Sequence, residues 1–438
     1  MTNMIKKIDF GKTPLDELHH IFKYTTPEEL EAKKARLFPS GNADNEVSTI
    51  SIFLASLSAV KEYREELFSE IGITKLKARN ATLCAFTELN SSATGDRPDG
   101  LIVITSGMHK PIIEWACFVE AKVKDNQINE TQIDKYADFA KEIGINNIIT
   151  ISNHLVTNPK ETPIKIKRRS FNLYHWSWTY LKVTGSRLIR TEKVKDEDHI
   201  YLLQELRRYF DTHKNLKSYV NMGKDWKDSV NQIHPYSPEQ KIEAHLLSNI
   251  VKSLKQEEKD ISLQMTDRTD FHVELLVKGD REEEIEKMLQ KSKVVTCNYI
   301  LNKDKKNTFT LEIDFIRQKI KCSTNITVNQ GKAQAQTSAL INMFQDIAAT
   351  SHVVVNAYYI RKKCNNKNIT LAQLIDEKRD GDFYSILDKG FGDDIKTFEI
   401  KTEDLLGKDF QSVKNFIIKV ESIAYRFISQ VMANNKKS

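Results

Sequence analysis

Four short apolar runs lie close together in the first half of this 438-residue chain, with one helical pattern among them. The runs are Leu83–Glu88, Leu101–Ile104, Trp115–Lys122 and Asn147–Ser152. Each has the length and apolar character of a buried strand. Between the third and fourth runs, residues 129–143 carry apolar side chains at helical spacing and end before Gly144. The order strand, strand, strand, helix, strand predicts an α/β fold for this part of the chain.

A further helix is expected before these strands, from about Val47 to Ile71. One apolar stripe runs along it at helical spacing, formed by Ile50, Phe53, Leu57, Val60, Leu67 and Ile71. Asp44 or Asn45 can cap this helix, and Glu46 falls in its first turn on the side of the stripe. Glu46 either complements the helix dipole or reaches the strand ends, and both readings stay open. Glu65 and Glu66 fall away from the stripe, so we expect both at the surface.

Acidic and basic side chains interrupt two of the expected strands. Asp99 lies before the run Leu101–Ile104, separated from it by Gly100, and Glu120 and Lys122 lie near the end of the next run. Side chains in a strand alternate between faces, so Glu120 and Lys122 point the same way. Adjacent strands can bring Asp99 beside Glu120, and two carboxylates at that range suit Mg²⁺. The alternative reading makes Asp99 a turn residue after Pro98 and places Glu120 and Lys122 on a solvent-exposed edge strand.

The helix after the third strand adds two polar side chains. Asn129 is expected to cap it, with Gln132 in the reciprocal position of a capping box. Gln132 and Tyr136 are four residues apart and therefore share a helix face. We expect Tyr136 to lie partly in the core, with its hydroxyl reaching toward Asp99 and Glu120.

These motifs resemble the PD-(D/E)XK nuclease superfamily over about residues 45–180. That superfamily carries Pro-Asp on its second strand and Glu-x-Lys on its third, here Pro98-Asp99 and Glu120-Ala121-Lys122. The Gln132-x-x-x-Tyr136 helix is similar to that of RecB-like branches. The resemblance implies a restriction-endonuclease-like core with a mixed sheet, built from a helix, three strands, a helix and a strand.

The resemblance also implies a reaction, the hydrolysis of phosphodiester bonds. Asp99 and Glu120 would hold Mg²⁺, with Mn²⁺ as a substitute, and Glu46 and the carbonyl of Ala121 would complete the metal shell. Lys122 would position the attacking water and stabilise the transition state. Gln132 would orient Lys122 or a phosphate. DNA is the expected substrate, because most of the superfamily cuts DNA. The resemblance also implies a restriction or phage-defence role, which is the commonest setting for stand-alone members. The alternatives are a nucleic-acid-binding protein or a scaffold that keeps the fold without cleavage.

Several basic residues near these motifs are candidates for phosphate contacts. Lys124 and Lys135 flank the Gln132 helix start, and a cluster follows the core at Lys165, Lys167, Arg168 and Arg169. The aromatic stretch Tyr174–Tyr180 comes next, and basic residues beside aromatic ones suit a single-strand groove with stacking platforms. The alternative is a loop followed by a core strand and a helix start, in which the tryptophans are buried.

The composition excludes few functions. Lys and Arg number 66 against 60 Asp and Glu, and a net charge of +6 is compatible with nucleic acid without requiring it. The five cysteines form no Cys-x-x-Cys pair, so a zinc ribbon or redox motif is not expected. The start of the chain lacks an apolar signal core and no run has membrane-spanning length, which favours a cytoplasmic protein without a membrane partner.

Four segments are expected along the chain. Residues 1–44 form a solvated helical lead-in, 45–185 the nuclease-like domain, 186–237 a helical linker, and 238–438 a separate C-terminal α+β domain for recognition or assembly. The boundary is placed at the Pro-rich stretch His234–Pro238, with Ser237 capping a helix that runs to Leu254. The order strand, strand, strand, helix, strand recurs over residues 294–360, so a decayed second copy of the fold is considered. A homodimer also stays open.

Overall fold

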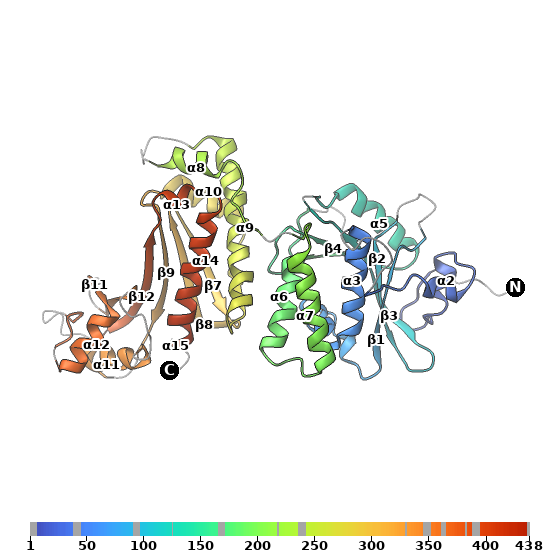
Figure 1. Cartoon of the computed structure of the whole chain (residues 1–438), viewed down its shortest axis with the longest axis horizontal. Helices are drawn as coiled ribbons and strands as arrows, with labels where there is room; N and C mark the ends of the chain where they lie inside the picture. Colours follow the sequence, from blue (N-terminus) through green and yellow to red (C-terminus); the bar gives the residue numbers. More distant parts are fainter. Residues whose placement is uncertain are drawn as a thin grey trace. The chain divides into compact units, whose positions relative to one another are not determined.

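The computed structural model divides the chain into two compact units, Met1–Ser218 and Tyr219–Ser438. Each unit has its own sheet (Figure 1). The structure describes residues 7–37, 45–90, 97–124, 126–164, 171–216, 219–234, 242–328, 331–344, 352–360, 365–381, 383–387 and 395–435. The division falls before the expected boundary at His234–Pro238. No helix among these described residues is both long and apolar enough to span a membrane.

The first unit is an α/β domain around a five-stranded mixed sheet. Its strands are β1 Ala81–Thr87, β2 Gly100–Ser106, β3 Ile112–Ala121, β4 Asn147–Ser152 and β5 Asn172–Ser177, in that spatial order. The first three strands pair antiparallel, and β4 and β5 continue parallel to β3. The helices are α1 Leu18–Ile21, α2 Pro27–Glu31, α3 Glu46–Ala59, α4 Lys61–Glu70, η1 Lys75–Lys77, α5 Glu130–Glu142, α6 Trp178–Arg190 and α7 Glu197–Thr212. The expected α/β class and mixed sheet are confirmed.

Helices cover both faces of this sheet. On one face α5 and the N-terminal segment share a core with side chains from β1, β2 and β3. On the other face Phe53 of α3 contacts both Trp176 and Trp178 edge-on, and Phe68 of α4 contacts Trp115 and Trp176. Trp176 and Trp178 are buried, so they are core residues and not stacking platforms for bases.

Two expected segment roles in this unit are wrong. The described part of the expected lead-in, residues 7–37, is not solvated, because Leu18, Phe22 and Leu30 belong to the core beside α5 and the amide of Ala35 donates to the carbonyl of Ala85 in β1. Residues 186–212 are not a linker. Their helix α7 packs on the first unit, where the Thr49 hydroxyl of α3 lies 3.1 Å from that of Tyr209.

The long helix expected over residues 47–71 is two helices. Val60 ends α3 with an extended backbone, at φ −96° and ψ 105°, and α4 begins at the next residue. The apolar stripe is nevertheless buried along both helices, from Ile50 to Ile71. Glu65 and Glu66 are not fully at the surface, since Glu66 pairs with Arg187 and keeps a side-chain exposure of only 19%.

The second unit contains a seven-stranded antiparallel sheet. Its strands are β6 Val273–Leu275, β7 Val294–Leu301, β8 Asp304–Asp314, β9 Lys319–Ile326, β10 Val354–Tyr359, β11 Asn365–Thr370 and β12 Ile395–Leu405, in the order β11-β10-β12-β9-β8-β7-β6. The helices are α8 Trp226–Ile233, α9 Ala244–Arg268, α10 Arg281–Lys291, α11 Ala333–Phe344, α12 Leu371–Asp380, α13 Lys408–Gln411, α14 Asn415–Phe427 and α15 Ala433–Asn435, with the π-helix η3 Ile428–Met432 between the last two.

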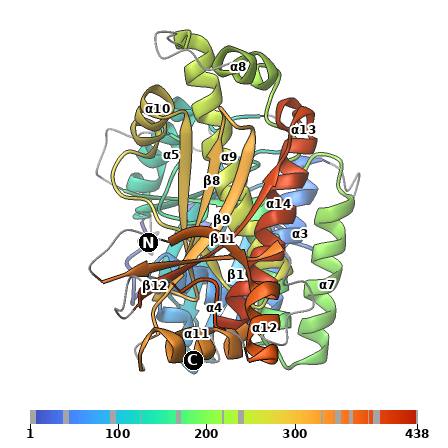
Figure 2. The same ribbon diagram turned by 90° about the vertical axis from the view of Figure 1, so that its left-hand side faces the viewer.

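The described apolar core of this unit lies on one face of the seven-stranded sheet. Along β7, Val295, Cys297 and Tyr299 are buried, whereas Asn298 between them is exposed, as the period of two in a strand requires. Helices α9 and α14 pack on the apolar face, and in Figure 2 α9 passes behind the strands.

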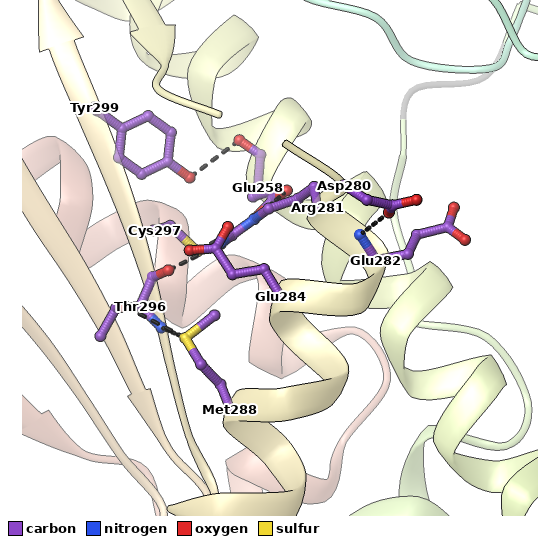
Figure 3. Close-up of polar contacts among 9 residues, drawn as sticks. All are labelled: Glu258, Asp280, Arg281, Glu282, Glu284, Met288, Thr296, Cys297 and Tyr299. Atoms are coloured by element: carbon purple, nitrogen blue, oxygen red, sulfur yellow. Dashed lines mark hydrogen bonds and ion pairs between the residues drawn. The ribbon is translucent and has the colours of Figure 1, made fainter. Parts of the chain in front are cut away.

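A buried ion pair joins three elements of this unit. Figure 3 shows the Arg281 guanidinium of α10 between Glu258 of α9 and strand β7. Its Nε and Nη2 each donate to the Glu258 carboxylate, at 2.9 and 2.8 Å, and Nη2 also donates to the carbonyl of Thr296. Helix α9 continues to Arg268 and does not end at Leu254 as expected. The charged residues 257–260, which include Glu258, are buried within it. The expected cap Ser237 lies outside the described residues.

The second unit is not a decayed copy of the first. Strand β10 pairs with β12, which the sequence reading missed, and β12 separates it from β9. All neighbours in this sheet run antiparallel, whereas the fourth strand of the first unit runs parallel to the third.

Candidate active site

The pairing of β2 with β3 brings the two expected carboxylates together. Gly100 pairs with Val119 in antiparallel register, so Asp99 comes opposite Glu120. Asp99 Oδ2 accepts a hydrogen bond of 2.8 Å from the amide of Ala121, which fixes its carboxylate against the end of β3. The amide of Ala121 is therefore bonded to Asp99, and the role of the Ala121 carbonyl as a metal ligand stays a prediction.

Gly100 lets α3 approach this point closely. A Cβ at Gly100 would lie 2.8 Å from Leu54 of α3 and 3.3 Å from the carbonyl oxygen of Phe86. The absence of a side chain therefore allows the helix that carries Glu46 to pack directly over the strand that carries Asp99.

Glu120 is the most deeply buried acid of the site. Its relative exposure is 1%, and Oε2 has no hydrogen-bond donor in the part of the chain that the structure describes. Burial, and then the nearby charge of Asp99, raise the pKa of Glu120 to about 8. Burial also raises the pKa of Asp99, while the Ala121 amide opposes this effect. Two carboxylates whose pKa values are raised by burial form a site that favours bound positive charge.

Lys122 supplies one such charge. Its Nζ lies 2.5 Å from Glu120 Oε1 and 3.4 Å from Glu46 Oε1. Burial lowers the pKa of Lys122, but the ion pair with Glu120 and the charges of Asp99 and Glu46 outweigh it, so the pKa lies above its ordinary value. Lys122 therefore stays protonated in the metal-free protein.

Glu46 reaches the site from the first turn of α3. Asn45 caps the helix by accepting from the amide of Ser48 at 2.6 Å. Glu46 Oε2 accepts from the amide of Val123 at 3.2 Å, and its charge contributes to the raised pKa of Asp99. The structure thus brings Glu46 together with the expected trio.

Gln132 acts on Tyr136 in this structure, and Tyr136 faces the acids. Asn129 caps α5 by accepting from the amide of Gln132 at 3.3 Å, as expected. Gln132 Nε2 then donates to the Tyr136 hydroxyl at 2.7 Å, which donates to the carbonyl of Arg97 at 3.0 Å. Burial, followed by the charge of Glu120, raises the pKa of Tyr136. The expected role of Gln132 in orienting Lys122 or a phosphate stays a prediction.

The sequence reading missed Trp178 as a residue of the site. Its indole Nε1 donates to the carbonyl of Lys122 at 3.0 Å, from the first residue of α6. The signal in the sequence was Ser177, a helix-capping residue directly before Trp178. A cap followed by a tryptophan predicts a helix that begins in the core.

The expected basic residues are only partly placed. Lys124 directly follows the site and Lys135 lies on α5, and both are exposed. Lys165, Lys167, Arg168 and Arg169 lie outside the described residues.

The carboxylates fit a divalent cation in part. The unpaired buried oxygen of Glu120, next to Asp99, is a hard oxygen donor of the kind that Mg²⁺ prefers. Among the described residues, however, no three His, Cys, Asp or Glu side chains form a group that could hold a metal ion. Glu46 is bonded to Lys122 and Val123, so the structure offers a pair of acids, with the third turned toward the lysine.

Comparison with known proteins returned no match to any family model, curated protein or solved structure.

Proposed function

We propose that this protein is a metal-dependent nuclease that hydrolyses phosphodiester bonds of nucleic acid, with DNA as the expected substrate. One observation carries the proposal. Asp99 and Glu120 face each other across two strands, Glu120 keeps an unpaired buried oxygen, and Lys122 lies 2.5 Å from the same carboxylate. An Asp-Glu-Lys set of this kind is what the resemblance to PD-(D/E)XK nucleases requires. A restriction or phage-defence setting belongs to the same proposal.

Each residue has a distinct role in the proposed reaction. Asp99 and Glu120 would hold Mg²⁺ or Mn²⁺, which when bound lowers the pKa of a coordinated water and neutralises charge on the phosphate. Lys122 stays protonated and donates toward the developing negative charge. Glu46, 3.4 Å from the ammonium group of Lys122, helps to hold that group in place.

The Tyr136 hydroxyl has a structural role beside Glu120. It is fixed between Gln132 and the backbone of Arg97, so it borders the two acids without carrying charge. The exposed Lys124 and Lys135 are the described basic residues that we expect to contact the polynucleotide backbone.

Cleavage assays test the proposal directly. The purified chain is incubated with supercoiled plasmid, linear duplex and single-stranded DNA or RNA, in Mg²⁺, Mn²⁺ or EDTA. We expect cleavage only with metal. Asp99→Ala, Glu120→Ala and Lys122→Ala should each abolish it with the fold intact, and calorimetry should show weaker metal binding for the two acid variants but not for Lys122→Ala. Glu65→Ala is the matched control and should cut normally.

The other outcomes separate the alternatives. Binding of nucleic acid without cleavage under any metal would identify a binding protein that keeps the fold. Absence of both binding and cleavage would favour a scaffold. Wild-type turnover in any of the three variants would remove that residue from the proposed machinery.

A further inference from the structure

The three residues that follow β3, Lys122–Lys124, are held by hydrogen bonds from separate elements. The amide of the first donates to the carbonyl of Ile151 in β4 at 2.7 Å. The amide of the second donates to Glu46 at 3.2 Å, and the amide of the third donates to the carbonyl of Asn215 at 2.9 Å. The direction in which the Lys122 side chain leaves the backbone therefore depends on these partners.

Lys124 needs this support because its backbone is strained. Its φ of 61° lies in the left-handed region, which a lysine rarely adopts. The carbonyl of Lys124 accepts from Asn153 Nδ2 at 2.8 Å, and the same amide nitrogen donates to the carbonyl of Asn215 at 2.9 Å. Asn215 thus holds the strained turn through both Lys124 and Asn153.

His213 connects Asn215 to the first turn of α3. Its Nδ1 accepts from the amide of Asn215 at 3.2 Å, and its Nε2 lies 3.1 Å from the hydroxyl of Thr49. The Thr49 hydroxyl donates its single hydrogen to the carbonyl of Asn45 at 2.8 Å, so it accepts from His213. A backbone amide can only donate, so Nδ1 carries no proton. These two conditions require the neutral imidazole with hydrogen on Nε2.

We propose that His213 is a positioning residue of the candidate active site, which couples the first turn of α3 to the turn at Lys122–Lys124. On one side it fixes Thr49, three residues after Glu46. On the other it fixes Asn215 and so the turn that directs Lys122. It therefore sets how Glu46 meets the Lys122 ammonium group. This inference rests on the proposed nuclease function for its effect on rate, but not for its geometry.

A histidine is suited to this place because it donates from one ring nitrogen and accepts at the other across a rigid ring. Phenylalanine keeps the ring and loses both contacts. Glutamine can still donate to Thr49, in the place of Nε2. His199, at the other end of α7, pairs with Glu62 at 2.7 Å and provides a matched control.

Two structural measurements on the full chain test the inference without any cleavage. Nitrogen-15 NMR should show His213 as the neutral tautomer with hydrogen on Nε2 at pH 7.5. His213→Phe should speed hydrogen exchange of the Lys124 amide by about fivefold or more, the value of one lost hydrogen bond, and His199→Phe should not. An Nδ1–H tautomer, or unchanged exchange at Lys124 in His213→Phe, would overturn the proposal. If His213→Phe does not fold, His213→Gln takes its place and should still speed exchange of the Lys124 amide, because glutamine can keep the contact with Thr49 but loses the one with Asn215.

The rate measurement uses a double-mutant cycle with Glu46→Gln. His213→Phe should lower kcat about tenfold and leave KM unchanged. This decrease lies between the one expected for the loss of a single hydrogen bond and the one expected for a misplaced catalytic group. His213→Gln should recover part of this loss. In the Glu46→Gln background, His213→Phe should cost less than about twofold. Full additivity of the two changes would contradict the coupling. If the parent chain cuts no nucleic acid, the proposed function fails, and the tautomer and exchange results still decide this inference.

Discussion

Replacement of Glu120 by glutamine should stabilise the metal-free protein at high pH, although it removes a candidate catalytic group. Burial and the charge of Asp99 raise the pKa of Glu120 from 4.5 to about 8. Between these two values the folded protein keeps a proton that the unfolded chain has lost. Stability therefore falls as the pH rises from about 4.5 to about 8, and it stays low above that range.

The size of this effect follows from the same pKa. One pKa unit corresponds to about 1.4 kcal/mol, so the rise to about 8 corresponds to at most about 5 kcal/mol of unfolding free energy. Two interacting carboxylates titrate as a pair, so part of this free energy belongs to Asp99. We therefore expect Glu120→Gln to raise the unfolding free energy at high pH by about 3 kcal/mol. Glutamine is neutral at every pH and close in shape. The unfolding free energy of the variant should equal that of the parent near pH 4 and exceed it at pH 9.

Urea unfolding followed by circular dichroism, in EDTA at several pH values, measures the difference. Glu114→Gln on the same strand is the control, because a hydrogen bond from Ser106 lowers the pKa of Glu114 and its replacement should bring no gain at pH 9. Added Mg²⁺ should stabilise the parent at pH 9 and have little effect on Glu120→Gln. A glutamine variant no more stable than the parent at pH 9 in EDTA would refute the reasoning.

Three further predictions concern stability and are measured by the same urea titration. Arg281→Met should cost about 3–5 kcal/mol, because it leaves Glu258 buried and unpaired, and adding Glu258→Leu should recover at least half of the loss. Glu66→Ala should lower the unfolding free energy by about 1 kcal/mol, because Glu66 pairs with Arg187 and is not the surface residue that the sequence predicted. Glu65→Ala should lower it by less than about half of that. Gly100→Ala should cost about 1–3 kcal/mol, since its Cβ would overlap a packed helix; a neutral result would contradict the close approach of α3 to β2.

Local patterns in the sequence were sufficient for most elements of the first unit. Hydrophobic periodicity predicted β1 to β4 and α5, because a strand or helix that buries one face must repeat its apolar residues with its own period. The same reasoning put Asp99, Glu120 and Lys122 on neighbouring strands. It failed at residues 7–37, where irregularly spaced residues such as Leu18 and Phe22 are buried in the core that they share with α5 and the sheet.

What the sequence determined by itself is therefore most elements of the first unit and the common face of Glu120 and Lys122. Only the tertiary structure decided which elements meet. The register of β2 with β3 sets Asp99 opposite Glu120, and the packing of α3 and α7 brings Glu46 and His213 to the end of β3. These contacts join residues far apart in the chain, and local periodicity carries no information about them, because it reports only which side of an element is buried.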